Sequence, residues 1–139
     1  MPQFLFDSDH LTLYQYKHPP LMQRFALQPA DSVAICPINI EEIMRGRLGS
    51  LARVLTGNKH VQAYARLVAA EEMFRRFPLV PFDAVSESEF QHLRASGLRV
   101  GTLDLKIAAI ALTNGLTVLT RNRRDFGRVP GLVIKDWSV

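Results

Sequence analysis

The chain has 139 residues, of which 47% are hydrophobic. This is enough for one domain, spanning residues 1–139, that is stable without disulfides. Its single cysteine, Cys36, excludes an intrachain disulfide framework and lies in an apolar run where we expect a buried thiol. No apolar stretch reaches the roughly 18 residues that cross a membrane, and no signal-peptide pattern is present, so we expect a cytoplasmic protein. The formal charge of +4 permits a polyanionic partner but does not require one.

Strands and helices alternate in the first half of the chain. Residues 3–6 form an apolar run that ends at Asp7 and predict a buried strand. Residues 32–36 predict a second strand, and residues 10–26 between them predict a helical segment that breaks at two consecutive prolines. After Pro37 we expect another helix, with Asn39 as its N-cap.

The second half continues the alternation. Residues 59–76 predict a long helix, because apolar side chains recur on one face at steps of three and four. Residues 79–82 indicate a short strand or extended link, and Ser86 with Glu89 suggests a capping box for a helix over 86–95. The remaining elements that we expect are a helix at 103–113, a strand at 117–120, a helical turn at 122–126 and a strand at 132–134.

This order of elements predicts an α/β fold with a mostly parallel sheet covered by helices on both faces. Sites in such folds form beyond the carboxyl ends of the strands. Asp7 and Asn122 lie at or just past two of those ends.

Four carboxylates fall at such places: Asp7, Glu42, Asp104 and Asp125. Each has an ordinary explanation alone, since Glu42 and Asp104 can simply favour a helix dipole and Asp125 can be a surface turn residue. Brought together, they would repel one another, and a hard divalent cation with oxygen ligands would relieve that repulsion. Mg²⁺ or Mn²⁺ held in this way supports phosphodiester hydrolysis. The set therefore favours a metal-dependent nuclease.

The order of the motifs resembles that of PIN domains, and in particular of VapC-type toxins, over essentially the whole chain. Four segments carry the resemblance: LFDSD at 5–9, INIEEIMRG at 38–46, VGTLDLKIAA at 100–109 and LTRNRRDF at 119–126. The resemblance implies a three-layer α/β/α sandwich and an endoribonuclease that uses Mg²⁺ or Mn²⁺. It also implies a homodimer and a small antitoxin protein that covers the site.

The register of these motifs implies a role for each acidic position. Asp7, Asp104 and Glu42 correspond to catalytic residues, of which Asp7 and Asp104 bind the metal directly and Glu42 either binds it or orients a water molecule. Asp125 corresponds to a further catalytic acid that orients ligands or holds a second metal. Asn122 is either part of the site or only the N-cap of the following turn.

The chain also departs from the PIN pattern. Asp9 stands where the family usually has Asn, and on an extended segment Asp7 and Asp9 would point to the same side. Asp9 therefore either joins the metal site or forms a local turn. Thr102 and Leu103 replace a frequent proline, and residues 94–99 form a shorter segment than usual, which affects the expected shape of the substrate groove.

Four arginines lie close together in a short segment near the C-terminus: Arg121, Arg123, Arg124 and Arg128. Arg121, Arg123 and Arg124 are candidates for contacts with RNA phosphates, although a solvated loop explains them equally well. The four histidines show no ligand spacing and are interpreted as ordinary surface or partly buried residues: His10, His18, His60 and His92.

Two other functions remain open on the sequence. The D-x-D spacing of Asp7 and Asp9 is similar to that of haloacid-dehalogenase-type phosphatases, but that family also needs a late lysine and a G-D-x-x-x-D-like pair, and no such pair is found. The second alternative is a PIN-fold module that binds RNA or a partner without catalysis, because a fold does not guarantee its activity.

Overall fold

The computed structural model describes all residues, 1–139. Its centre is a four-stranded sheet with the order β2-β1-β3-β4, in which every neighbouring pair is parallel. The strands are β1 (Phe4–Phe6), β2 (Val33–Ala34), β3 (Thr117–Leu119) and β4 (Ile134–Lys135). Leu5 pairs with Ala34 on one side and with Val118 on the other. Because all four strands run the same way, their carboxyl ends meet at one edge.

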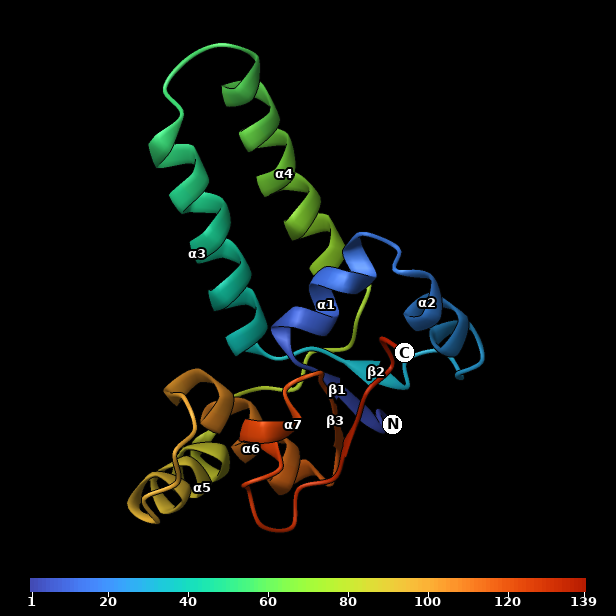
Figure 1. Cartoon of the computed structure of the whole chain (residues 1–139), viewed down its shortest axis with the longest axis vertical. Helices are drawn as coiled ribbons and strands as arrows, with labels where there is room; N and C mark the ends of the chain where they lie inside the picture. Colours follow the sequence, from blue (N-terminus) through green and yellow to red (C-terminus); the bar gives the residue numbers. More distant parts are fainter.

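Helices cover both faces of this sheet, and α3 and α4 extend from it as a long antiparallel hairpin (Figure 1). The seven helices are α1 (Ser8–Gln15), α2 (Pro19–Ala26), α3 (Pro37–Arg53), α4 (Asn58–Phe74), α5 (Ala84–Ala95), α6 (Thr102–Asn114) and α7 (Arg123–Phe126). The expected three-layer α/β/α architecture is therefore confirmed, with a fully parallel sheet. No helix is both long enough and apolar enough to cross a lipid bilayer.

Alternation along the strands separates two cores. Leu5 and Val118 point to the face covered by α5 and α6, whereas Phe4, Phe6 and Leu119 point to the face covered by α1, α2 and the base of the α3–α4 hairpin. Since side chains on a strand alternate between faces, a buried sheet needs apolar residues at every position. This is why the short strands are uniformly hydrophobic.

Two predicted helix starts are wrong by a few residues. Cys36, not Asn39, is the N-cap of α3, and Pro37 occupies the first helical position, where its missing N–H costs nothing. Asn39 instead accepts a hydrogen bond from the Cys36 N–H at 2.8 Å. For α5 the N-cap is Asp83, whose carboxylate accepts from both the backbone and the hydroxyl of Ser86, so the expected capping box is absent.

Strand boundaries also shift. The last strand begins at Ile134, two residues later than predicted, and Leu79 forms an isolated parallel bridge with Ile35 rather than a full strand. Helix α3 continues through Gly46 and Gly49 to Arg53. At the end of α6, Gly115 adopts the left-handed conformation that favours glycine, with φ of 65°.

Candidate metal centre

Asp7 lies where β1 ends and α1 begins, and its side chain is almost fully buried. Its carboxylate caps α1 by accepting the His10 N–H at 2.7 Å. Burial raises the pKa of Asp7 to about 7, although bonds from Thr120 and the His10 N–H favour the ionised form. The negative charges of Asp9 and Asp104 raise that pKa further. A carboxylate held in this way gains from a nearby cation.

Asp104, in the first turn of α6, faces the same site. Burial raises its pKa to about 6, and the charges of Glu42 and Asp125 add to that increase. The Asn122 amide donates a hydrogen bond to Asp104 at 3.4 Å, and this bond lowers the pKa of Asp104 and so opposes the increase. The structure therefore brings together carboxylates from the first, second, third and fourth motifs.

The first turns of α3 are fixed to the end of β1 by a buried amide. Asn39 is fully buried and donates to the Phe6 carbonyl at 3.1 Å and to the Ser8 hydroxyl at 3.2 Å. The Ser8 hydroxyl in turn donates to Glu42 at 2.7 Å. Asn39 and Ser8 thus determine where the Glu42 carboxylate lies, and neither was assigned that role from the sequence.

Asn122 is an N-cap and also contacts two of the acidic residues. Its side-chain oxygen caps α7 by accepting the Asp125 N–H, and its amide donates to Asp125 at 3.1 Å as well as to Asp104. The hydrogen bond from Asn122, followed by contacts with Arg124 and Arg128, holds the pKa of Asp125 below its usual range. Asp125 therefore stays ionised and acts on the site through Asn122.

His10 is the main residue that the sequence interpretation missed, because it is fully buried rather than at the surface. Its Nε2 accepts the Trp137 N–H at 3.1 Å, and its Nδ1 lies 3.6 Å from the Asp7 carboxylate with no hydrogen-bond partner. Burial lowers the pKa of His10 to about 4. A neutral imidazole that accepts at Nε2 carries its proton on Nδ1, which points that N–H toward Asp7.

Asp9 departs from the predicted geometry. It lies in the first turn of α1, not on an extended segment, and forms neither a local turn nor an isolated charge. Arg121 donates to both of its carboxylate oxygens at 2.7 Å, and both side chains are about half exposed. Arg121 thus neutralises much of the extra charge that this chain carries beside Asp7.

This ion pair predicts how metal affinity responds to substitution. Asp9→Asn should weaken Mn²⁺ binding modestly, because Arg121 then lies unpaired beside the site, whereas Arg121→Gln should tighten it, because the Asp9 charge then lies unpaired beside Asp7. Each change should alter the free energy of unfolding by less than about 1 kcal/mol, as expected for an exposed pair. Calorimetric Mn²⁺ titration checks the prediction, and a large loss of affinity in Asp9→Asn would make Asp9 a direct ligand.

The other predicted RNA contacts, Arg123 and Arg124, lie at the start of α7 and are exposed. Arg124 approaches Asp125 at 3.3 Å, while Arg123 makes no side-chain ion pair. Of the two, only Arg124 contacts one of the acidic residues.

Two donor sets share Asp7. Asp7, Asp9 and His10 place ligand atoms within 4.8 Å of one another. However, Nδ1 of His10 carries a proton, and both Asp9 oxygens already accept from Arg121, which offsets the Asp9 charge. The carboxylates of Asp7, Asp104 and Glu42 do not meet that spacing, but they interact electrostatically and are hard oxygen donors of the kind that Mg²⁺ and Mn²⁺ prefer.

Comparison with known proteins decides the family. The sequence model of the PIN domain matches residues 17–132. A Rickettsia felis protein named ribonuclease VapC1 is 30% identical over 101 residues, which cover 72% of each chain. The chain belongs to the VapC family of PIN-domain ribonucleases. A tRNA(fMet)-specific endonuclease VapC from Salmonella typhimurium is 29% identical over 99% of each chain.

Solved structures agree with this membership. The crystal structure of DNA-bound VapBC from Salmonella typhimurium contains a chain that superposes with a TM-score of 0.83 at 28% identity, covering 99% of both chains. The implied VapC-type ribonuclease toxin is thereby confirmed, and the haloacid-dehalogenase alternative is not supported.

Proposed function

We propose that this VapC protein is an endoribonuclease that depends on Mg²⁺ or Mn²⁺ and that Asp7, Asp104 and Glu42 hold the ion. The observation that carries the proposal is electrostatic: burial and neighbouring carboxylates raise the pKa of Asp7 to about 7 and that of Asp104 to about 6. Because the ionised forms of these carboxylates are unfavourable without a counter-charge, a divalent cation at this site would stabilise them.

The chain's own residues have separate parts in this proposal. Ser8 orients the Glu42 carboxylate, and Asn122 connects Asp104 with Asp125. The buried His10 directs its Nδ1–H toward the Asp7 carboxylate, 3.6 Å away. When bound, the divalent ion supplies Lewis-acid chemistry that polarises the phosphodiester and activates water.

A cleavage assay tests the proposal. Purified protein should cut RNA internally with Mg²⁺ or Mn²⁺, stop when EDTA is added and resume when metal is restored in excess. Cleavage that persists in EDTA would exclude the metal mechanism. A folded protein that binds RNA without cutting it under any metal condition would favour the non-catalytic PIN module.

The relatives indicate which RNA substrate and which kind of partner protein to test first. Because a relative that covers nearly the whole chain is named for tRNA(fMet), we take initiator tRNA as the first substrate to test. The VapBC complexes support a small antitoxin as partner. If a short reading frame lies directly upstream, co-expression with it should yield a complex that does not cleave RNA. Light scattering of the free toxin should give the mass of a homodimer.

The arginines near the site should contribute to RNA affinity rather than to sequence choice. Replacing Arg121, Arg123 and Arg124 with Ala should weaken binding by a similar factor for unrelated RNA sequences. The slope of log Kd against log salt should fall, because fewer counterions are released. Anisotropy titrations in EDTA at several salt concentrations measure this, and an unchanged slope would make these residues an ordinary solvated loop.

A further inference from the structure

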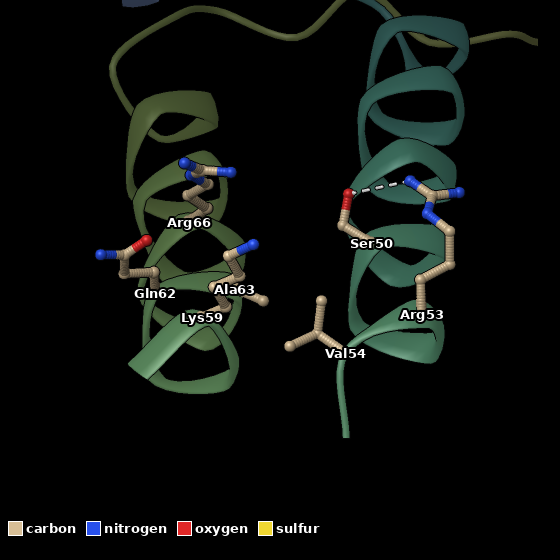
Figure 2. Close-up of a pocket in the computed structure, with 7 residues that line it drawn as sticks. All are labelled: Ser50, Arg53, Val54, Lys59, Gln62, Ala63 and Arg66. Carbon is tan, nitrogen blue, oxygen red and sulfur yellow. Dashed lines mark hydrogen bonds between the residues drawn. The ribbon is translucent and has the colours of Figure 1, made fainter. Parts of the chain in front are cut away.

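A pocket of about 280 Å³ lies between α3 and α4 at the distal end of the hairpin, far from the sheet (Figures 1 and 2). Its polar lining comes from Ser50 and Arg53 on α3 and from Lys59, Gln62 and Arg66 on α4. No carboxylate lines it. Figure 2 shows these side chains on both helices, with the Arg53 guanidinium donating to the Ser50 hydroxyl at 3.4 Å.

The charge of this part of the hairpin is unbalanced. Residues 43–70 contain five basic residues and no acidic one, so the formal charge of this segment is larger than the net charge of +4 of the entire chain. Of its cations, Arg45 pairs with Glu41, which lies nearer the sheet. Arg53, Lys59 and Arg66 are exposed and make no ion pair. Three free cations around one concave surface form a site for an anion such as phosphate.

A helix face without side chains, called the glycine track below, runs along α3 from the acidic site to this pocket. Glu42, Gly46, Gly49 and Arg53 follow one another at steps of four, three and four, which places them on one face of the helix. A Cβ added at Gly46 would meet nothing within 4 Å, and one at Gly49 would meet only the Arg53 guanidinium at 3.8 Å. This one face of α3 therefore carries no side chain between Glu42 and Arg53.

The length of this track matches a single extended ligand. At about 1.5 Å of rise per residue, Glu42 and Arg53 are roughly 16 Å apart along the helix axis. A ligand that reaches both the pocket cations and the acidic site is an extended polyanion, and the RNA substrate is such a polyanion.

We propose that the distal α3–α4 pocket binds phosphates of the RNA substrate through Arg53, Lys59 and Arg66, as a second anchor separate from the acidic site. The proposal rests on the ribonuclease function proposed above. The substrate would then lie along the glycine track, with one phosphodiester at the carboxylates and a flanking phosphate in the pocket. Arginine and lysine bind phosphate without reading bases, so this anchor adds affinity and not sequence preference.

The test compares two variants of equal charge. One carries Arg53→Gln, Lys59→Gln and Arg66→Gln, and the control carries Lys17→Gln, Arg76→Gln and Arg94→Gln, which are exposed cations outside the pocket. In EDTA, fluorescent initiator tRNA should bind the pocket variant at least about tenfold more weakly, with a salt slope smaller by about three. The control should change Kd by less than about threefold. In Mn²⁺, the pocket variant should raise KM while kcat stays close to the wild-type value.

Other results would overturn the proposal. Equal losses in the two variants would mean that only net charge matters, and an unchanged Kd in the pocket variant would remove the anchor outright. Loss of poly-L-glutamate binding with RNA binding intact would assign the pocket to an acidic polypeptide. If the wild-type protein binds tRNA through the pocket but never cuts it, the ribonuclease function fails while the phosphate site stands. Circular dichroism melts confirm that both variants fold.

Discussion

Asp7→Asn should reduce RNA cleavage by about a thousandfold or more, equivalent to ~4 kcal/mol of transition-state stabilisation. The substitution removes the charge that the metal requires but keeps the local structure. Asn caps helices about as well as Asp, so the bond from the His10 N–H to position 7 is retained. The loss of activity should therefore occur in a folded protein.

Asp83→Asn is the matched control for this substitution. Asp83 caps α5 by accepting the Ser86 N–H at 2.9 Å, so the same chemical change is made at an equivalent cap far from the site in sequence. Cleavage rates and circular dichroism melts of both variants give the comparison. Near wild-type cleavage by folded Asp7→Asn would refute the assignment of Asp7.

In EDTA, Asp7→Asn should become increasingly more stable than the wild-type protein as pH rises from about 4 to about 7. Burial raises the pKa of Asp7 from 3.8 to about 7, so in this window the folded state keeps a proton that the unfolded chain releases. Folding stability from this group is complete below pH 4 and is lost as pH rises through 7. Asn has no such proton, and the difference should reach a few kcal/mol.

The comparison with Asp7→Asn is needed because other groups titrate in the same range. The pKa of Asp104, raised to about 6, contributes with the same sign as Asp7. His10 contributes with the opposite sign, since its pKa is lowered to about 4 and stability rises with pH between 4 and about 6.5. Both groups are present in the two proteins, so their own burial contributions cancel in the difference, and what remains is the Asp7 contribution together with its coupling to Asp104.

Added Mn²⁺ should reverse the order of stability at pH 8. The wild-type protein should gain several degrees in melting temperature, because the ion binds only the folded state, while Asp7→Asn should gain little. Thermal melts at pH 5 and pH 8, each with EDTA or Mn²⁺, measure both effects. A stability difference that is independent of pH in EDTA would contradict the buried, proton-retaining state of Asp7.

The positions of Asp7 and Asn122 were predictable because they depend on local patterns. An apolar run that ends in Asp, and a strand followed by a short capped turn, place those side chains at the carboxyl edge of a parallel sheet. The N-cap of α3 was misassigned to Asn39 because two residues satisfy the helix start in another way. Pro37 at the first helical position has no N–H that needs a partner, and Asn39 at the third position accepts the Cys36 N–H.

The environments of His10 and Asp9 were not predictable because their partners are distant in the chain. His10 is buried by the C-terminal segment, 127 residues away, and Asp9 pairs with Arg121, 112 residues away. Neither contact leaves a periodic or capping pattern near the residue itself. Only the sheet order, which brings β1 beside β3 and β4 beside β3, makes these pairs neighbours.

The most direct measurement is an anomalous-diffraction map from crystals of the wild-type protein soaked in Mn²⁺. We predict a peak bound by carboxylate oxygens of Asp7 and Asp104, with Glu42 at the same site, at distances of about 2.0–2.3 Å. The same map from Asp7→Asn crystals should show that peak lost or strongly reduced. A peak among Asp7, Asp9 and His10, or none near Asp7 and Asp104, would contradict the assignment of the metal centre.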